Sequence, residues 1–376
     1  MPSLLTYDVA IVGLGPVGAT LSALLGERRV VVLERDTAAH TLPRAAHLDG
    51  HALQILRSAG VAVDGRPLDG FDLVDRDGRL LFRGRPREAL PAGAPAGLLV
   101  HQPTVERALR QRLAELGVET RLGHTVEYIR QQDDGAVVAG TGPDGPFTVE
   151  ARVVVGCDGA RSVVRETIGG ALRGGGFEQP WLVVDILVRR PQSLPDRLLQ
   201  IADPARPTTY VPFADPRRRW EFKLLPGEDP DALRQPETVR KLLAPHVDPD
   251  AVEIERAVVY TFHDLVATRW RRGPLAIAGD AAHQMPPFLG QGLGAGLRDV
   301  AALAPRLLDI LDGAPLSVLD GYGSERQRHV ESVVRQAVRL GRLVTLPEPW
   351  AALRDRTLRA AHRAGGLHRR LLDVRG

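Results

Sequence analysis

Three short runs of consecutive apolar residues, each followed by a glycine-rich turn, are the clearest pattern along this chain. The first run is Val9–Val12, at the end of the segment Tyr7–Val12, and is followed by Gly-Leu-Gly-Pro-Val-Gly, an Ala/Leu-rich stretch and a second apolar run, Val30–Leu33. A run that is apolar on both faces is typical of a strand in the middle of a parallel sheet, whereas the Ala/Leu-rich stretch favours a helix. Residues 7–34 are therefore predicted to form one βαβ unit.

The other two apolar runs are Ala151–Val155 and Leu275–Ala278, and each leads into its own glycine-containing turn. Amphipathic or Ala/Leu-rich segments predict helices over 103–116 and from about 296 to 312, and further helical segments follow to the end of the chain. The pattern therefore predicts several buried strands, far apart in the sequence, whose carboxyl ends carry turns and helices.

The middle of the chain alternates between apolar and polar positions instead. Residues 125–150 suggest a hairpin or meander, and the connections farther along are rich in Pro and Asp. Such alternation suits an antiparallel sheet better than more βαβ repeats. The later runs that predict strands are Trp181–Val188, Thr208–Phe213, Arg219–Leu225 and Glu253–Thr261. The expected fold class is α/β, with a Rossmann-type unit, an inserted antiparallel sheet and C-terminal helices.

Composition narrows the function classes. The chain has 376 residues, 44% hydrophobic and 25% charged, and a net charge of only +3, which is ordinary for a globular protein. Its basic residues are spread along the chain, which argues against nucleic acid as a partner. The single cysteine, Cys157, excludes a disulfide framework and favours a reducing cytoplasm. The uncharged stretch Val9–Gly26 contains four glycines and a proline, so neither a membrane span nor a signal peptide is expected.

The first turn fills the pattern G-x-G-x-x-G with Gly13, Gly15 and Gly18, around Pro16 and Val17. Glycines at these positions let the backbone turn sharply and approach a pyrophosphate at the start of a helix. Glu34 ends the second apolar run, where a carboxylate can accept hydrogen bonds from ribose hydroxyls. An ordinary tight turn is the alternative, but strand, glycines and Glu34 together favour an adenine dinucleotide.

The second and third turns also carry a carboxylate each. Asp158 lies in Gly-Cys-Asp-Gly-Ala-Arg-Ser, which alone is a commonplace turn, and Asp280 lies in Gly-Asp-Ala-Ala-His. Asp280 directly follows the apolar run Leu275–Ala278 and needs hydrogen-bond donors, which a polyhydroxylated ribityl chain would supply. Four glycines between 290 and 296 would let backbone N–H groups approach a ligand oxygen at the start of a helix. If that oxygen belongs to a flavin ring, the helix dipole would stabilise the anionic reduced form.

These three motifs, in this order and spacing, resemble the class A flavoprotein aromatic monooxygenases with the para-hydroxybenzoate hydroxylase fold. The segment 260–292 is similar to the branch of 3-(3-hydroxyphenyl)propionate hydroxylases. The resemblance implies an FAD site. The residues that it implies for this site are Gly13, Gly15, Pro16, Val17, Gly18, Glu34, Arg35, Arg44, Gln102, Asp158, Asp280, Pro287, Gly290, Gln291, Gly292, Leu293 and Gly294.

The same resemblance implies a monooxygenase reaction in which NADH or NADPH reduces FAD, oxygen forms a flavin C4a-hydroperoxide, and a phenolic or other aromatic substrate is hydroxylated. Pro287 would lie near the reacting oxygen. Tyr260 and His263 are hypotheses for substrate contact or proton transfer; alternatively they are polar groups packed at a domain seam. No metal ligation is predicted, because His47, His51 and His101 lack a metal-ligand spacing.

The functional alternatives are a tailoring monooxygenase, with Baeyer–Villiger or epoxidase chemistry on a polyketide-like substrate, and a non-redox FAD-bound cyclase or binding protein. Relatives in this branch are expected to carry a C-terminal thioredoxin-like domain beyond the length of this chain. A homodimer is the expected assembly. The expected division is an FAD-binding domain over 1–70, 98–172 and 268–330, a substrate-binding sheet over 71–97 and 173–267, and a helical segment over 331–376.

Overall fold

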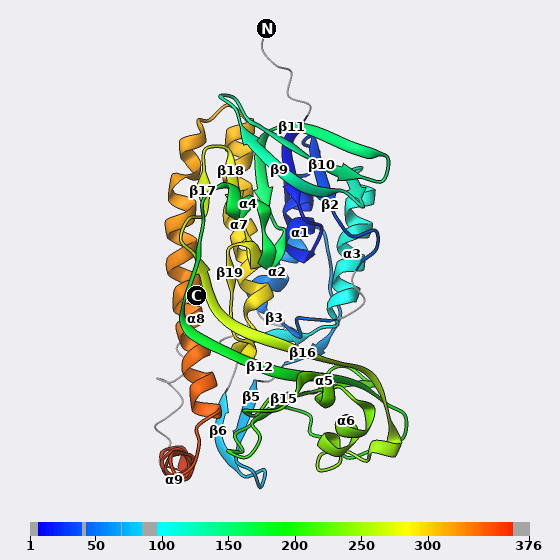
Figure 1. Ribbon diagram of the computed structural model, residues 1–376, viewed down its shortest axis with the longest axis vertical. Coiled ribbons are helices and arrows are strands. Elements are labelled where there is room, and N and C mark those ends of the chain that lie inside the picture. Colours follow the sequence, from blue (N-terminus) through cyan, green and yellow to red (C-terminus); the bar gives the residue numbers. More distant parts are fainter. Residues whose placement is uncertain (1–6, 40–42, 69, 85–95, 364–376) are drawn as a thin grey trace.

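Two large sheets and a set of helices make up the computed structural model, which describes residues 7–39, 43–68, 70–84 and 96–363. One sheet lies in the upper half of Figure 1 and the other crosses its lower half, while the longest helix, α8 (Asp320–Val344), runs along one side of both. The expected α/β class, with an antiparallel sheet in addition to the Rossmann-type unit, is confirmed.

The first sheet has a parallel core in the order β18-β11-β1-β2-β8, with β17 antiparallel at the edge. Val12 is the register partner of both Leu33 and Gly156, so the carboxyl ends of the three central strands lie at one edge. The hairpin strands β9 and β10 extend the sheet beside β11. The strands are β1 (Tyr7–Val12), β2 (Val30–Glu34), β8 (Glu119–Leu122), β9 (Thr125–Gln131), β10 (Ala136–Gly142), β11 (Gly145–Gly156), β17 (Arg271–Arg272) and β18 (Leu275–Ile277).

Helices α1 and α7 pack against each other beside this sheet, and small residues let them approach closely. A Cβ added to Gly296 of α7 would lie 2.7 Å from a methyl group of Val17 in α1. Helix α7 begins at Gly292, four residues before the expected start at about Gly296, because packing outweighs the low helix propensity of glycine there. The helices in this half are α1 (Pro16–Leu25), α2 (Gly50–Ser58), α3 (Gln102–Glu115), α4 (Val163–Thr167) and α7 (Gly292–Leu311).

The second sheet is mostly antiparallel, in the order β19-β16-β12-β15-β14-β13-β5-β6. Its longest strands, β12 and β16, pair along most of their length and curve across the molecule in Figure 1. One face packs on α5 (Pro230–Leu233) and α6 (Pro236–Leu243) through Trp220, Phe222 and other apolar residues. The strands are β5 (Phe71–Val74), β6 (Leu80–Gly84), β12 (Leu172–Val188), β13 (Leu198–Ile201), β14 (Thr208–Val211), β15 (Arg217–Lys223), β16 (Val252–Ala267) and β19 (His283–Gln284).

A small third sheet, in the order β3-β7-β4, lies between the two larger ones. The chain then ends its described part with α8 and α9 (Trp350–Arg363), and α9 packs beside β6. No helix in the described part of the chain combines the length and apolar character that a bilayer crossing requires. The remaining elements are β3 (His47–Asp49), β4 (Arg66–Pro67), β7 (Gly97–Leu99) and the short helices η1 (Gly159–Arg161), η2 (Pro249–Ala251), η3 (Gly279–Ala281), η4 (Pro287–Leu289) and η5 (Leu316–Leu319).

Candidate active site

One cavity of about 1040 Å³ lies between the carboxyl edge of the first sheet and one face of the second. Most of the residues expected from the sequence meet there. Its lining includes Gly13, Gly15, Pro16, Val17, Glu34, Arg35, Arg44, Gln102, Asp158, Tyr260, Asp280, Pro287, Gly290, Gln291, Gly292 and Leu293. Three expected residues, Gly18, Gly294 and His263, are not part of the lining.

The three glycines of the first turn have different surroundings. A Cβ on Gly13 would lie 2.4 Å from the carbonyl oxygen of Cys157, and one on Gly18 would lie 2.1 Å from that of Gly13. A Cβ on Gly15 would meet nothing within 4 Å. Gly13 and Gly18 therefore shape the turn, whereas Gly15 borders open cavity at the start of α1, where no side chain caps the helix. Uncapped N–H groups at a helix start are suited to phosphate oxygens.

Glu34 is fixed at the end of β2 by two backbone N–H groups. One carboxylate oxygen accepts from Leu14 N at 2.7 Å, and the other accepts from Asp36 N at 2.9 Å. Each oxygen keeps a further lone pair, so the side chain is held in place and can still accept hydrogen bonds from a ribose.

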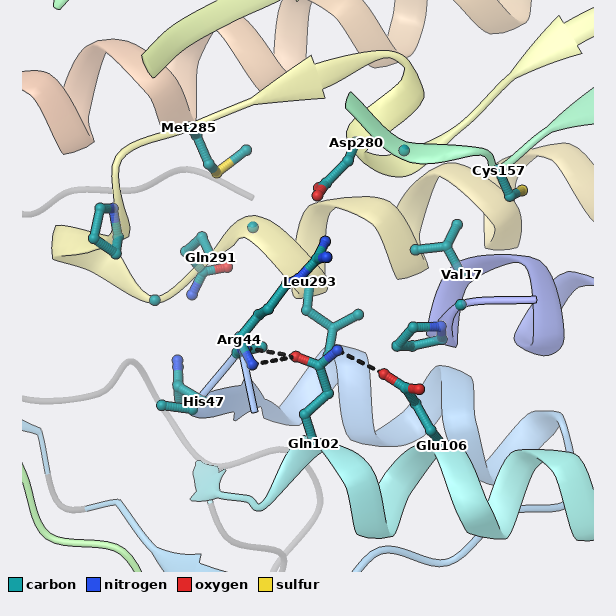
Figure 2. A pocket seen from close by; sticks show the side chains of 18 of the residues that line it. Val17, Arg44, His47, Gln102, Glu106, Cys157, Asp280, Met285, Gln291 and Leu293 are labelled. Carbon is teal, nitrogen blue, oxygen red and sulfur yellow. Dashed lines mark hydrogen bonds between the residues drawn. The ribbon is translucent and has the colours of Figure 1, made fainter. Parts of the chain in front are cut away.

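Gln102 acts here on the protein backbone. Its Oε1 accepts hydrogen bonds from Arg44 N at 3.1 Å and Ala45 N at 2.6 Å, and its Nε2 donates to Glu106 at 2.7 Å. Figure 2 shows these bonds and the Arg44 side chain extending toward Asp280. Gln102 thus fixes the segment from which a guanidinium enters the cavity, and one Nε2 hydrogen stays available to a ligand.

Two carboxylates in the cavity have oxygen atoms that no donor reaches among the described residues. Burial raises the pKa of Asp158, although nearby N–H and hydroxyl donors lower it in part, and its Oδ1 has no hydrogen-bond partner. Asp280 is exposed to the cavity, and desolvation by the surrounding protein raises the pKa of its carboxyl against the opposing effects of His283 and Arg44. Both side chains therefore fit a ligand rich in hydroxyl groups.

A buried network behind Asp280 holds its loop. Asp299 Oδ2 accepts from Gly279 N at 3.0 Å and lies 2.7 Å from His283 Nε2, and its Oδ1 accepts from Arg326 Nε at 2.9 Å. Burial alone would raise the pKa of Asp299, but His283 and Arg326 hold it below its usual value. Sequence reasoning missed Asp299, although an aspartate in the apolar stretch of α7 is a signal for a buried partner.

The segment from Pro287 to Leu293 borders the cavity where the two sheets approach each other. Helix α7 starts here at Gly292, and its N-cap, Gln291, offers no side-chain cap. The free N–H groups and the positive end of the helix dipole suit a ring oxygen that gains negative charge. Gly15, Glu34, Asp158 and Asp280 line the same cavity as this segment, and the donors and acceptors of this set suit the chemical groups of FAD.

The wall opposite is formed by the second sheet and carries buried charges that sequence reasoning missed. Asp185 accepts hydrogen bonds from Arg219 Nε at 2.7 Å and lies 2.6 Å from Arg256 Nη2. Arg256 Nη1 also donates to the Tyr260 hydroxyl at 3.2 Å. Alternating polar residues in β15 and β16 were the available signal, but alternation alone does not tell a cavity face from a solvent face.

Tyr260 lines this wall, but His263 does not. The two residues are three apart on β16, and side chains three apart on a strand point to opposite faces. The geometry therefore supports the hypothesis of substrate contact for Tyr260 and gives it no support for His263.

The model of a family described as FAD binding domain matches residues 6–337 of the chain. A probable NADH-specific resorcinol 4-hydroxylase of Rhodococcus jostii (strain RHA1) is 40% identical, over 95% of this chain and 69% of the relative. A 3-(3-hydroxy-phenyl)propionate/3-hydroxycinnamic acid hydroxylase of Burkholderia vietnamiensis (strain G4 / LMG 22486) is 39% identical, over 98% of this chain and 69% of the relative.

Solved structures give the same picture. The p-nitrophenol 4-monooxygenase of Pseudomonas putida DLL-E4 superposes with a TM-score of 0.85 at 27% identity, over 99% of this chain and 96% of its own. A ternary complex of aklavinone-11 hydroxylase with FAD and aklavinone gives a TM-score of 0.80 at 27% identity, over 89% and 68% of the two chains.

Proposed function

Because the chain belongs to the FAD binding domain family and is a class A flavin-dependent aromatic hydroxylase, we propose that its cavity holds FAD along the first sheet and a phenolic substrate beneath the second. The observation that carries this proposal is the meeting of all three glycine-containing turns in one cavity, with Glu34, Asp158 and Asp280 facing it. NADH is the proposed electron donor, since the resorcinol hydroxylase relative is named as specific for it.

Each part of FAD has a proposed partner. Glu34 and Arg35 would hold the adenosine half, and Gly15 with the start of α1 would hold the pyrophosphate with the help of Arg44. Asp158 and Asp280 would accept hydrogen bonds from the ribityl region. The segment Pro287 to Leu293 would border the ring. Gly18 and Gly294 would act by permitting close packing, since neither lines the cavity.

When bound, FAD would accept electrons from the nicotinamide donor and would activate O₂, so that one oxygen atom can be transferred to an electron-rich ring. The protein contributes the surroundings of that chemistry. The N–H groups at the start of α7 would stabilise negative charge on the ring. Phe288 packs edge-on against Phe177 and Trp181 and so keeps water from that side of the cavity.

Tyr260 is the residue we propose for contact with the substrate hydroxyl. Its oxygen already accepts a hydrogen bond from Arg256, so its own proton is available to donate. The Arg256 guanidinium lies over the Tyr260 ring, 5.8 Å from its centroid, and fixes its position. This assignment replaces the pair of Tyr260 and His263 expected from the sequence.

The central test is to purify the protein, measure FAD per chain, and follow NADH oxidation and product formation with resorcinol, p-nitrophenol and 3-(3-hydroxyphenyl)propionate. Stoichiometric FAD and a hydroxylated product are expected. Absence of flavin would refute the proposal. FAD that NADH and NADPH fail to reduce with any phenol present would favour the non-redox alternative, and an epoxide or lactone product would favour the tailoring alternative.

Asp280→Ala tests the proposed ribityl contact. The variant should lower FAD occupancy well below one per chain, because it removes an acceptor that faces the cavity. Asp309→Ala on the exposed side of α7 is the matched control and should keep full occupancy. Full occupancy in both variants would contradict the assignment.

A homodimeric assembly and a cytoplasmic location stay proposals, and light scattering of the purified protein would test the first.

A further inference from the structure

Three polar side chains lie side by side on the cavity face of the second sheet. Gln200 of β13 is the register partner of Thr209 in β14, and Thr209 is the partner of Glu221 in β15. All three are at least nine-tenths buried and line the cavity. On the next strand, the partner of Glu221 is Val183, which is apolar and also lines the cavity.

The hydrogen bonds within this group leave defined positions for a ligand. Thr209 donates its hydroxyl proton to Gln200 Oε1 at 3.0 Å. Among the described residues, nothing takes the two Nε2 hydrogens of Gln200, and no hydrogen bond reaches the Glu221 carboxylate. The closest cation to Glu221 is Arg219 at 3.7 Å, although the Glu221 side chain is only 9% exposed. A buried carboxylate without a donor is costly, so a ligand donor at this position would be favourable.

The two guanidinium groups near this site are already engaged. Arg219 donates to Asp185 and to the carbonyl oxygens of Pro43 and Arg44. Arg256 contacts Asp185, the Pro43 carbonyl and the Tyr260 hydroxyl. Among the described residues, Nε is the one nitrogen of Arg256 without a partner, and it is enclosed by protein.

The formal charges on this wall sum to zero, because two arginines face Asp185 and Glu221. Among the described residues of this wall, a carboxylate-bearing ligand would therefore find no uncommitted cation, and it would meet the negative charge of Glu221. A neutral hydroxyl group would instead match both the free acceptor and the free donor of this group of side chains, because it can donate to the Glu221 carboxylate and accept from Gln200 Nε2.

We propose that Gln200, Thr209 and Glu221 determine substrate specificity by binding a hydroxyl group of a neutral phenol, and that they discriminate against aromatic carboxylates. This inference rests on the proposed function and names the substrate class for the same cavity. Burial also raises the pKa of Glu221, as expected for a carboxyl that lacks a donor of its own. The two relatives described above differ in this respect, since one is named for resorcinol and the other for aromatic acids.

The test uses the FAD-loaded enzyme and compares kcat/KM for resorcinol with kcat/KM for 3-(3-hydroxyphenyl)propionate. The wild type should prefer resorcinol. Glu221→Gln keeps the side-chain shape but removes the charge. It should lower kcat/KM for resorcinol about tenfold or more, and it should lower the ratio of kcat/KM for resorcinol to kcat/KM for 3-(3-hydroxyphenyl)propionate. The FAD content should stay unchanged. Glu255→Gln, at an exposed glutamate of β16, is the matched control and should leave both values unchanged.

The outcomes separate this inference from the proposed function. Equal or greater efficiency with the carboxylated phenol in the wild type, or an unchanged ratio in Glu221→Gln, would overturn the inference while leaving a working hydroxylase. Absence of FAD or of any NADH-dependent hydroxylation would overturn the proposed function itself. If Glu221→Gln does not fold, the variant Thr209→Val tests the same inference. It removes the hydroxyl group that donates to Gln200 while leaving a branched side chain of similar size, and it should lower kcat/KM for resorcinol more than for the carboxylated phenol.

Discussion

At the residue scale, the cavity wall formed by the second sheet, which we call the substrate wall in line with the proposed function, contains buried charges that lower the stability of the folded protein. Glu221 is the clearest case, because burial is the largest influence on its pKa and raises it despite the attraction of Arg219. A carboxyl whose pKa is higher in the folded than in the unfolded state stabilises the fold below its unfolded pKa, about 4.3, and this contribution is lost as the pH rises through the folded pKa.

Glu221→Gln should therefore increase the stability of the FAD-loaded, substrate-free enzyme. The amide is neutral at every pH, so the melting temperature of the variant should exceed that of the wild type at pH 7.5. The difference should shrink as the pH falls toward 4.5. Thermal unfolding at a series of pH values measures this. A variant that is less stable than the wild type at pH 7.5 would show that Glu221 is stabilised by contacts other than those described.

Tyr260 and His263 show, also at the residue scale, how much the sequence of a single strand can predict about which side chains face a cavity. Both were inferred from a single polar stretch, and strand alternation alone excludes that both face the same way. Which of them faces the cavity depends on the register of β16 with β12, in which Tyr260 is opposite Trp181 and His263 is opposite Glu178, where a regular stretch of pairing ends. That register is set by packing far along the chain, so the sequence near residue 260 does not determine it.

At the scale of elements, two glycines of the turn that leads into α1 have different roles, one in folding and the other in the proposed binding of FAD. Gly18→Ala should destabilise the protein strongly, because its Cβ would overlap the Gly13 carbonyl at 2.1 Å. Gly15→Ala should fold normally, since Gly15 has an extended backbone at φ −70° and open space around the added carbon. The same carbon would occupy the space proposed for the pyrophosphate, so the FAD dissociation constant should rise at least about tenfold.

Fluorescence titration with FAD and thermal unfolding of the flavin-free protein distinguish these two effects. Gly26→Ala is not a suitable control because its backbone lies at φ +63°, whereas Gly321→Ala, at a position with free space, is suitable. An unchanged FAD affinity in Gly15→Ala would place the pyrophosphate elsewhere. A normal melting temperature in Gly18→Ala would contradict the close approach of Gly18 to the Gly13 carbonyl.

The elements of the cofactor half could be predicted because each is local. A buried strand, a glycine turn and a helix start lie within about twenty residues of one another, and parallel strands bring their carboxyl ends together. The substrate wall could not be predicted in the same way. Asp185, Arg219 and Arg256 become neighbours only through the pairing of β12 with β15 and β16, across 34 and more residues of sequence.

At the scale of the whole molecule, the cavity depends on how the second sheet is held against the first. The long strands β12 and β16 run from one half of the molecule to the other in Figure 1. Helix α8 runs along one side of both sheets, and α9 packs beside β6 at the edge of the second sheet. Arg354 of α9 is only 5% exposed and joins three parts. It donates to the carbonyl oxygens of Leu343 and Val344 at the end of α8, and to that of Ala202 beside β13 at 2.6 Å.

Arg354→Ala should lower the free energy of unfolding by about 2–4 kcal/mol, because it leaves buried carbonyl groups without donors and removes a packed side chain. Arg356→Ala, at an exposed position of the same helix, should change it by less than about 0.5 kcal/mol. FAD content should stay at one per chain in both variants, since Arg354 does not line the cavity. Chemical denaturation of the FAD-loaded enzyme measures the difference. Equal stabilities would mean that the hydrogen bonds of Arg354 contribute nothing to holding α9 against α8 and the second sheet.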